Sequence, residues 1–373
     1  MASLEFESLD ELTAHLDAGG HLRNAVLQNL DLRAVRERIL AADPRGAVFL
    51  GCTMDAATRT ALWDHEALIF PPLPGLPYQP YRAALYDGRE LYAGFDPDTP
   101  DSYAETLDGR IYRHWQQTGG AEPATLLEAL ARRLHDLSIT NALDEEVRRH
   151  ERLVAVMGGH GLARTATRYR DVAHLARTLT RRGYVLISGG GPGAMEATHL
   201  GACFADRSDD DLEHALTLLA TAPHYTDRRW LSTAFDVIDR FGLDQERPVS
   251  LGIPTWLYGH EPPTPFASHI AKYFANSLRE EGLITLARHG IIFAPGGPGT
   301  IQEVFQDNAQ NYYETLDVVS PMVFLDRDFW SFTRPAYPLV RQLAMNRRYD
   351  PLVTAVDTPE EVVTFIERHP PLR

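Results

Sequence analysis

The sequence has two cysteines, one lysine and no long apolar run, and these absences exclude several classes of protein. Cys52 and Cys203 are too few for a disulfide framework or a zinc knuckle. No apolar stretch approaches the roughly 20 residues that span a bilayer. The start, MASLEFESLDEL, lacks the basic and apolar segments of a signal peptide. We therefore expect a soluble, cytoplasmic protein.

Acidic residues outnumber basic ones, and this balance limits the partners that the chain attracts. The sequence has 51 Asp and Glu against 36 Lys and Arg, which gives a formal net charge of −15. Such a charge disfavours non-specific binding to nucleic acid and to anionic membranes. It does not exclude a small anionic ligand, because a single loop can carry positive potential whatever the net charge. We expect a small-molecule partner, and neither nucleic acid nor membrane.

Motifs for metals and other cofactors are also missing from the sequence. The histidines show no paired spacing of the kind that suits zinc. Lys272 is the only lysine, and therefore the only group that could hold pyridoxal phosphate as a Schiff base. We predict that the protein needs neither a metal nor another cofactor.

Beyond residue 150, short apolar runs alternate with amphipathic segments, the pattern of a parallel sheet covered by helices on both faces. Helix-capping residues mark the last helix, where Asp357 or Thr358 precedes Pro359 in the first turn. Residues 151–373 are predicted to form a Rossmann-like, doubly wound α/β domain. Strands are expected at residues 152–158, 184–190, 249–254, 290–295 and 320–326, and helices at 170–183, 194–204, 268–288 and after 357.

The first 120 residues predict a small accessory α/β domain. Two short apolar runs, at residues 46–51 and 66–74, flank a helix-like segment. Residues 121–150 predict a helical connector between the two domains. The acidic run DRSDDDLEH at residues 206–214 is typical of a solvated helix start, because acidic side chains favour the positive end of the helix dipole.

Two glycine-rich loops follow predicted strands and precede predicted helices. They are SGGGPGAMEA at residues 188–197 and APGGPGTIQE at residues 294–303. Glycine permits the sharp strand-to-helix turn, and the unpaired first-turn N–H groups of a helix attract anions. Open parallel sheets bind ligands at the carboxyl ends of their strands, where both loops lie. Together the loops predict a nucleotide or sugar-phosphate site.

The upstream loop also matches G-x-G-x-x-A through Gly189, Gly191 and Ala194, which is typical of dinucleotide-binding oxidoreductases. That fingerprint belongs after the first strand of a domain, whereas here it follows the second. Glu303 follows the other loop by one helical turn. A carboxylate beside a phosphate is unfavourable unless it acts on a neighbouring atom, so Glu303 is a candidate catalytic residue.

The segment PGGPGTIQE at residues 295–303 resembles P-G-G-x-G-T-x-x-E, the signature of the LONELY GUY (LOG) phosphoribohydrolases, long labelled lysine decarboxylases. GGGPGAM at residues 189–195 is similar to the upstream glycine motif of that family, and MGGHG at 157–161 takes the place of its first-strand loop. With EPPTP at 261–265, the chain looks most similar to the longer bacterial nucleotide 5′-monophosphate nucleosidases. The resemblance covers roughly residues 150–373.

This resemblance implies an enzyme that hydrolyses a nucleoside 5′-monophosphate to a free base and ribose 5-phosphate. It implies that Glu303 stabilises positive charge on the ribose or orients the attacking water. The family pairs this glutamate with an arginine on the preceding helix, which is Arg279 here or, if the spacing differs, Arg288. The implied phosphate ligands are Gly296, Gly297, Gly299 and Thr300, with Gly190, Gly191 and Met195 lining the other side.

The resemblance also implies a homodimer, with residues 268–278 and 306–313 near the interface. The region around residues 206–247 is an insertion relative to the short LOG proteins. There, Tyr225, Arg228 and Arg229 are expected to be ordinary helix and interface residues rather than a lid. Two other functions stay open: a non-catalytic nucleotide or cofactor carrier of LOG-like fold, and the dinucleotide-dependent oxidoreductase.

Overall fold

The computed structural model describes residues 4–243 and 247–373, so positions 244–246 of the predicted insertion lie outside the described residues. The chain forms two compact units. One contains the residues up to 85 together with 122–144, and the other contains residues 86–121 together with 145–373. This partition differs from the predicted boundaries near 120 and 150, because residues 86–121 group with the later residues rather than with the N-terminal ones.

The first unit contains a parallel sheet of four strands in sequential order, where the sequence predicted only two. Right-handed connections between sequential parallel strands place their helices on one face of the sheet. On that face Leu27 and Phe49 pack with Leu12, Ile39 and Leu62. The elements are β1 (Glu5–Phe6), α1 (Leu9–Asp17), β2 (Val26–Gln28), α2 (Arg36–Ala41), β3 (Val48–Leu50), α3 (Ala56–Asp64) and β4 (Leu68–Phe70). Helix α6 (Leu126–Val147) begins in this unit and ends in the other.

The second unit contains a seven-stranded parallel sheet in the order β11-β10-β9-β5-β6-β7-β8. The strand order runs outward in both directions from the β5–β9 pair, so the sheet is doubly wound and the predicted fold class is confirmed. Strand β11 was not predicted. The strands are β5 (Leu153–Met157), β6 (Val185–Ser188), β7 (Ser250–Gly252), β8 (His269–Ile270), β9 (Ile291–Phe293), β10 (Met322–Leu325) and β11 (Val353–Val356).

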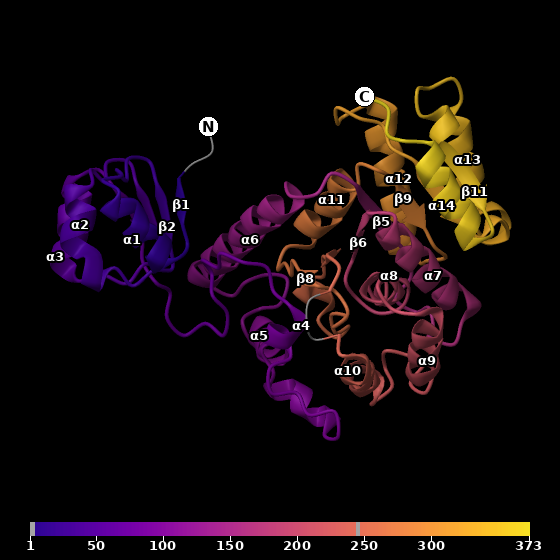
Figure 1. Cartoon of the computed structure of the whole chain (residues 1–373), viewed down its shortest axis with the longest axis horizontal. Coiled ribbons are helices and arrows are strands. Elements are labelled where there is room, and N and C mark those ends of the chain that lie inside the picture. The colour runs from indigo at the N-terminus through magenta and orange to yellow at the C-terminus, as the bar shows by residue number, and fades with distance from the viewer. Residues whose placement is uncertain (1–3, 244–246) are drawn as a thin grey trace. The chain divides into compact units, whose positions relative to one another are not determined.

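Helices cover both faces of this sheet (Figure 1). Alternate strand residues such as Val156 and Leu186 pack against α7, α8 and α14. On the opposite face Phe293 stacks on Phe324, and α12 contacts both α11 and α13. The helices are α4 (Gly88–Leu91), α5 (Leu107–Gln117), α7 (Thr167–Arg181), α8 (Ala194–Cys203), α9 (Asp209–Leu219), α10 (Trp230–Phe241), α11 (Asn276–Leu286), α12 (Pro298–Tyr313), α13 (Ala336–Ala344) and α14 (Pro359–Arg368).

Helix starts that carry capping residues were predicted well. Ser208 and Asp211 form a capping box at the start of α9, which confirms that the acidic run begins a helix. Thr358 and Glu361 do the same for α14, with Pro359 in its first turn. These side chains satisfy backbone N–H groups that have no partner inside the helix.

The predicted helix at residues 268–288 is wrong in its first part. Residues 269–270 form β8, which pairs with β7 and forms a bridge to Tyr86, and α11 begins only at Asn276. The side chains from Ile270 to Phe274 are all buried. A mostly apolar, fully buried segment fits a strand and its following loop as well as a helix, so periodicity alone could not separate them.

Within the second unit, a buried ion pair links residues 86–121 to the later residues. Lys272 Nζ lies 2.5 Å from Asp108 Oδ1, and both side chains are fully buried. Trp256 donates its Nε1 hydrogen to the same carboxylate, and Tyr103 donates its hydroxyl hydrogen to Asp108 Oδ2. Lys272, the residue considered for Schiff-base chemistry, is thus occupied as the partner of Asp108.

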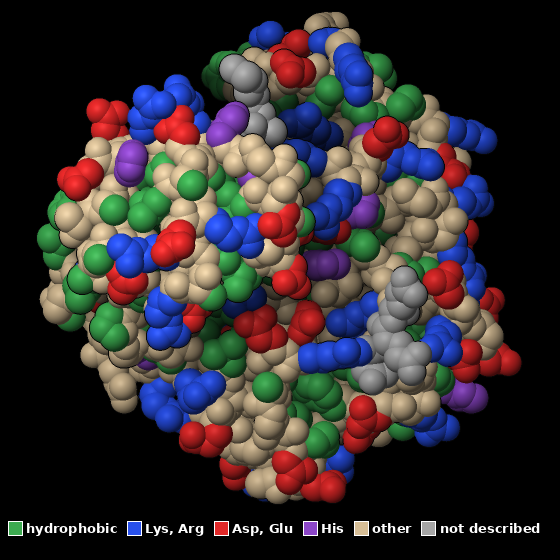
Figure 2. All heavy atoms as spheres, turned by 60° about the vertical axis from the view of Figure 1, so that its left-hand side comes forward, with side chains coloured by type: hydrophobic (Ala, Val, Ile, Leu, Met, Phe, Trp, Pro, Cys, Tyr) green, Lys and Arg blue, Asp and Glu red, His purple; other side chains and the backbone are tan. Residues whose placement is uncertain are grey.

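The surface is consistent with the charge balance of the sequence. Figure 2 shows basic and acidic side chains interspersed on the face that it draws, rather than one large basic patch. Among the described residues, no helix is long and apolar enough to cross a membrane.

Candidate functional site

The candidate site lies where the strand order reverses, at the carboxyl ends of β5 and β9. These two strands are neighbours, and the chain leaves them toward opposite sides of the sheet. The loops that follow them touch: a Cβ added at Gly159 would lie 3.2 Å from the Cα atom of Gly296. Doubly wound sheets bind ligands at such a switch point. The sequence placed the site at the loops after β6 and β9, whereas the β5 loop lies between them.

A cavity of about 730 Å³ occupies this position. Its wall combines the loops after β5 and β9 with side chains from α8, α11, the start of α12 and the segment before α13. The lining residues are Gly158, Gly159, His160, Gly161, Leu162, Met195, Tyr258, Glu261, Arg279, Glu280, Pro295, Gly296, Gly297, Pro298, Gly299, Thr300, Gln302, Glu303, Phe329 and Arg334. The predicted residues Gly296, Gly297, Gly299, Thr300, Met195, Arg279 and Glu303 are therefore brought together.

The loop after β9 ends in the N-terminus of α12, with Gly297 as the cap and Pro298 at the first helical position. The side chain of Thr300 turns back over the loop, since a Cβ added at Gly296 would lie 2.2 Å from its hydroxyl oxygen. Arg334 donates a hydrogen bond of 2.7 Å from Nη1 to the carbonyl oxygen of Gly296. A helix N-terminus, a hydroxyl group and a guanidinium thus converge here, which suits an anion. No motif in the sequence singled out Arg334.

Glu303 lies one turn further along α12, on the buried face of the helix. It lines the cavity, although the residue is only 8% exposed. None of the described residues donates a hydrogen bond to its carboxyl group. Burial raises the pKa of this carboxyl group to about 7; the nearby Arg279 opposes the shift and Glu280 adds to it. A buried carboxyl group that titrates near neutral pH is typical of catalytic acids and bases.

Arg279 is the arginine that the structure brings to Glu303. It projects from α11 into the cavity and donates a hydrogen bond of 3.1 Å from Nε to the carbonyl oxygen of Ile253. A Cβ added at Gly189 would lie 2.4 Å from its Nη2 atom, so the guanidinium also contacts the upstream glycine loop. Arg288 is exposed and follows the end of α11.

The upstream loop contributes less to the cavity than the sequence suggested. Met195 lines it, but Gly190 and Gly191 are buried: a Cβ added at Gly191 would lie 2.9 Å from Met195 Cε, and one added at Gly190 would lie 2.9 Å from Pro254 Cδ. The N-terminus of α8 is also covered. Ala194 donates its backbone hydrogen to Gly159, and a Cβ at Gly193 would lie 2.3 Å from the same carbonyl oxygen. This helix start is thus packed against the β5 loop.

Besides Arg334, the cavity wall includes other polar side chains that were not predicted as site residues, among them Glu261, Glu280 and Gln302. Gln302 donates from Nε2 to Glu280 Oε2 at 2.9 Å, and Asn276 donates from Nδ2 to Glu280 Oε1 at 2.6 Å. Glu280 directly follows Arg279 and Gln302 directly precedes Glu303, and this adjacency is the only sequence signal that could have identified Glu280 and Gln302.

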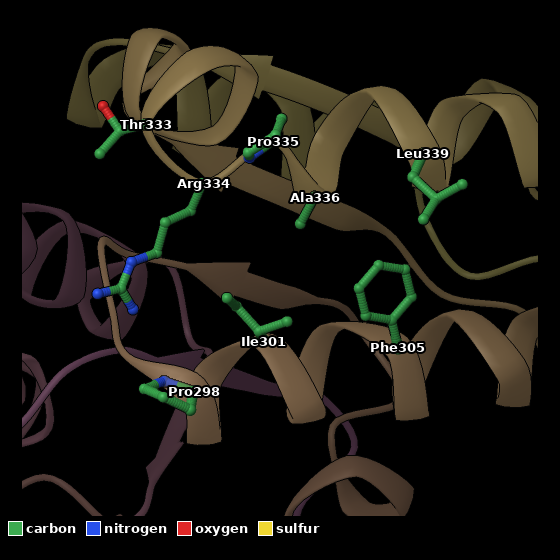
Figure 3. Close-up of a pocket in the computed structure, with 8 residues that line it drawn as sticks. All are labelled: Pro298, Ile301, Phe305, Thr333, Arg334, Pro335, Ala336 and Leu339. Carbon is green, nitrogen blue, oxygen red and sulfur yellow. The ribbon is translucent and has the colours of Figure 1, made fainter.

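An apolar groove of about 610 Å³ adjoins the cavity and shares Pro298 and Arg334 with it. In Figure 3, Ile301 and Phe305 of α12 point toward Ala336 and Leu339, while the guanidinium of Arg334 extends away from them, toward Pro298. The groove is therefore mainly apolar, and the guanidinium of Arg334 contributes its charge to the neighbouring cavity.

The insertion reaches the site through Tyr225, whose ring lies edge-on to His160 at 5.6 Å between centroids. Arg228 and Arg229 form surface ion pairs with Asp101 and Asp236. The two arginines are thus ordinary surface residues in the structure, whereas Tyr225 packs against a cavity residue.

No protein-family model matches the chain, and no curated protein matches it. Solved structures that it matches include the molybdenum cofactor binding protein from Rippkaea orientalis, at 17% identity and a TM-score of 0.38, over 59% of this chain and 97% of that one. They also include the Moco carrier protein from Chlamydomonas reinhardtii, at 15% identity and a TM-score of 0.37, over 59% and 97%. At such low values the similarity carries no argument about function. The topology and the cavity define an α/β protein with a candidate ligand site at the switch point of a doubly wound sheet.

Proposed function

We propose that the protein hydrolyses the N-glycosidic bond of a nucleoside 5′-monophosphate, releasing the free base and ribose 5-phosphate. The observation that carries this proposal is the buried carboxyl group of Glu303, which lines a cavity whose wall also holds an anion-binding helix N-terminus. The PGGPGTIQE motif and its resemblance to the LOG phosphoribohydrolases, in particular the longer bacterial nucleotide nucleosidases, support the same reaction.

In this proposal the phosphate binds at the start of α12. The backbone N–H groups of Gly299 and Thr300, the Thr300 hydroxyl and the Arg334 guanidinium supply the hydrogen bonds and the positive charge. The ribose then lies toward Glu303, which is one helical turn away.

The chemical step breaks the bond between C1′ of the ribose and the base nitrogen. The bonding electron pair leaves with the base, positive charge builds on the ribose, and water adds its oxygen to C1′. Ionised Glu303 stabilises that charge and takes the proton that the water loses, after which the proton passes to the departing base. Arg279 favours the ionised form of Glu303, because it opposes the rise in the pKa that burial causes.

Incubation of the protein with AMP, GMP, CMP, UMP, IMP and a cytokinin monophosphate tests this proposal directly. We expect equal molar amounts of free base and ribose 5-phosphate from at least one of them. Binding of a nucleotide without release of base would instead favour the non-catalytic carrier. The dinucleotide oxidoreductase is disfavoured because the N-terminus of α8, where its pyrophosphate would bind, is packed against the β5 loop.

We also propose that the protein is a homodimer, with part of the interface on α12, where Tyr313 is 73% exposed. Residues 270–274 of the other predicted interface segment are already buried within one chain. Light scattering at micromolar concentration is expected to give the mass of two chains, and a monomer would contradict this.

A further inference from the structure

The cavity wall holds a partly buried carboxylate, that of Glu280, which is hydrogen-bonded at both oxygens. Glu280 accepts one hydrogen bond at each oxygen, from Asn276 and from Gln302, at 2.6 and 2.9 Å. A carboxylate oxygen has two lone pairs, so each oxygen of Glu280 can accept a further hydrogen bond. Glu280 lines the cavity and lies close enough to Glu303 to raise the pKa of that residue.

Two neighbouring wall residues also present acceptors. The amide nitrogen of Gln302 faces Glu280, which leaves the amide oxygen as the group that can meet a ligand. Glu261 directs Oε1 toward His160 and His260, at 3.4 and 3.8 Å, which leaves Oε2 as an acceptor. The wall away from α12's first turn is therefore rich in groups that accept hydrogen bonds.

Most donors lie around the loop after β9, and Arg279 adds a guanidinium beside Glu303. Arg334, Thr300 and the N-terminus of α12 surround the loop after β9. Glu303, nine-tenths buried and without a hydrogen-bonding partner among the described residues, lines the same cavity. The cavity is thus suited to a ligand that places an anion at the loop after β9 and N–H donors beside Glu280 and Gln302.

We infer that the site selects nucleotides whose base carries an exocyclic amino group, through acceptors supplied by Glu280 and Gln302; this inference rests on the proposed function for the class of ligand. An amino group can donate a hydrogen bond to the carboxylate of Glu280. An oxo group at the same ring position turns its own lone pairs toward that carboxylate and leaves both groups unsatisfied. Cytosine and adenine carry such an amino group, whereas uracil and hypoxanthine carry the oxo group instead.

Calorimetric binding of two matched nucleotide pairs tests the inference. CMP is compared with UMP, and AMP with IMP, using the Glu303→Gln variant so that little ligand is consumed during the titration. We expect the amino-bearing member of at least one pair to bind about tenfold tighter. Adding Glu280→Gln should reduce that preference to about twofold or less while leaving the affinity for ribose 5-phosphate unchanged. Glu281→Gln, an exposed acid on the same helix, should change neither.

Equal binding within both pairs, or a preference that survives Glu280→Gln, would overturn the inference. These outcomes differ from failure of the proposed function. A protein that prefers CMP or AMP but releases no base retains the selective site and is not a hydrolase. A protein that hydrolyses and binds all four nucleotides equally is a hydrolase without this selectivity.

Discussion

Folding moves the carboxyl group of Glu303 out of water without giving it a hydrogen-bonding partner among the described residues. An arrangement of this kind costs stability when the group is ionised. At Glu303 the cost is reduced by Arg279 and increased by Glu280. The ionised group is therefore held ready for the positive charge that a ribose develops as its base departs.

The pKa of Glu303 makes stability depend on pH. Its pKa rises from 4.5 to about 7 on folding, so the unfolded chain loses this proton first as the pH increases. Below about pH 4.5 the carboxyl group is protonated in both states, and its burial costs the folded state least. Above about pH 7 the group is ionised in both states, and the folded state bears the full cost of burying the charge. Glu303→Gln removes it, so the gain in unfolding free energy over the wild type should grow by about 2 kcal/mol between about pH 5.5 and about pH 8.5. Urea unfolding measures this, and a gain independent of pH would contradict the assignment.

Arg279 and Arg288 make a matched pair for testing the cation. Arg279→Ala removes the positive charge that lowers the pKa of Glu303. We expect base release to fall by about tenfold or more, and the midpoint of its pH profile to move to higher pH. Arg288→Ala, an exposed residue, should leave both unchanged. If the two variants behave alike, Arg279 has no special role.

Among individual site residues, those that belong to one local sequence motif could be predicted from the sequence. Thr300 and Glu303 are one helical turn apart, so their spacing alone places them on one face of α12. Arg334 was missed because it reaches Gly296 from a distant segment, and no local pattern records such a contact. Gly190 and Gly191 were expected to face the ligand, but the packing of Pro254 on the first and of Met195 on the second buries them, which no local pattern records.

At the scale of elements, the loop before α12 needs different glycines for different reasons. The Cβ position of Gly296 is filled by the Thr300 side chain, whereas that of Gly297 is open, with only Arg334 Nη1 nearby at 3.8 Å. Gly297 has a φ of −92°, which alanine adopts easily. A side chain at position 297 therefore fits the folded protein, and it would collide only with an anion bound at the loop.

Gly297→Ala should leave the fold intact and weaken binding. We expect the unfolding free energy to change by less than about 1 kcal/mol, and the affinity for ribose 5-phosphate to fall by about tenfold. Gly282→Ala, in the middle of α11 with no atom near its Cβ position, is the control. It should stabilise the protein by about 0.5–1 kcal/mol without changing affinity. Loss of the fold in Gly297→Ala would show that this glycine is structural.

The strands of the second unit were predicted where burial leaves an unbroken apolar run, as in β5 and β9. The same rule failed at residues 269–274, where a short strand and a buried loop share the composition of a helix. The short strands β1 and β2 carry too few residues for a periodic pattern.

At the scale of the whole chain, residues 86–121 belong to the unit that holds the candidate site. Asp108 and Lys272 form their ion pair entirely out of water. Local sequence patterns cannot reveal such a pairing between distant residues. Nor could they reveal the strand order, which places the β5 loop rather than the β6 loop beside the loop after β9.

Breaking this pair should destabilise the second unit. Lys272→Met leaves the Asp108 carboxylate buried without its cation, and we expect a loss of about 3–5 kcal/mol in unfolding free energy. Adding Asp108→Asn should recover part of the loss, because the amide carries no charge. Urea unfolding followed by Trp fluorescence reports the change, since Trp256 contacts the pair. Losses that simply add in the double variant would contradict a direct interaction.

The central claim is that Glu303 acts on the bond-breaking step rather than on binding. The direct test compares wild type with Glu303→Gln, measuring single-turnover base release and calorimetric binding of the same nucleoside 5′-monophosphate. The account predicts a loss of about 10²–10⁴-fold in the rate of base release, with the dissociation constant unchanged or slightly lower because a charge near the phosphate is removed. Base release at the wild-type rate in Glu303→Gln would contradict it.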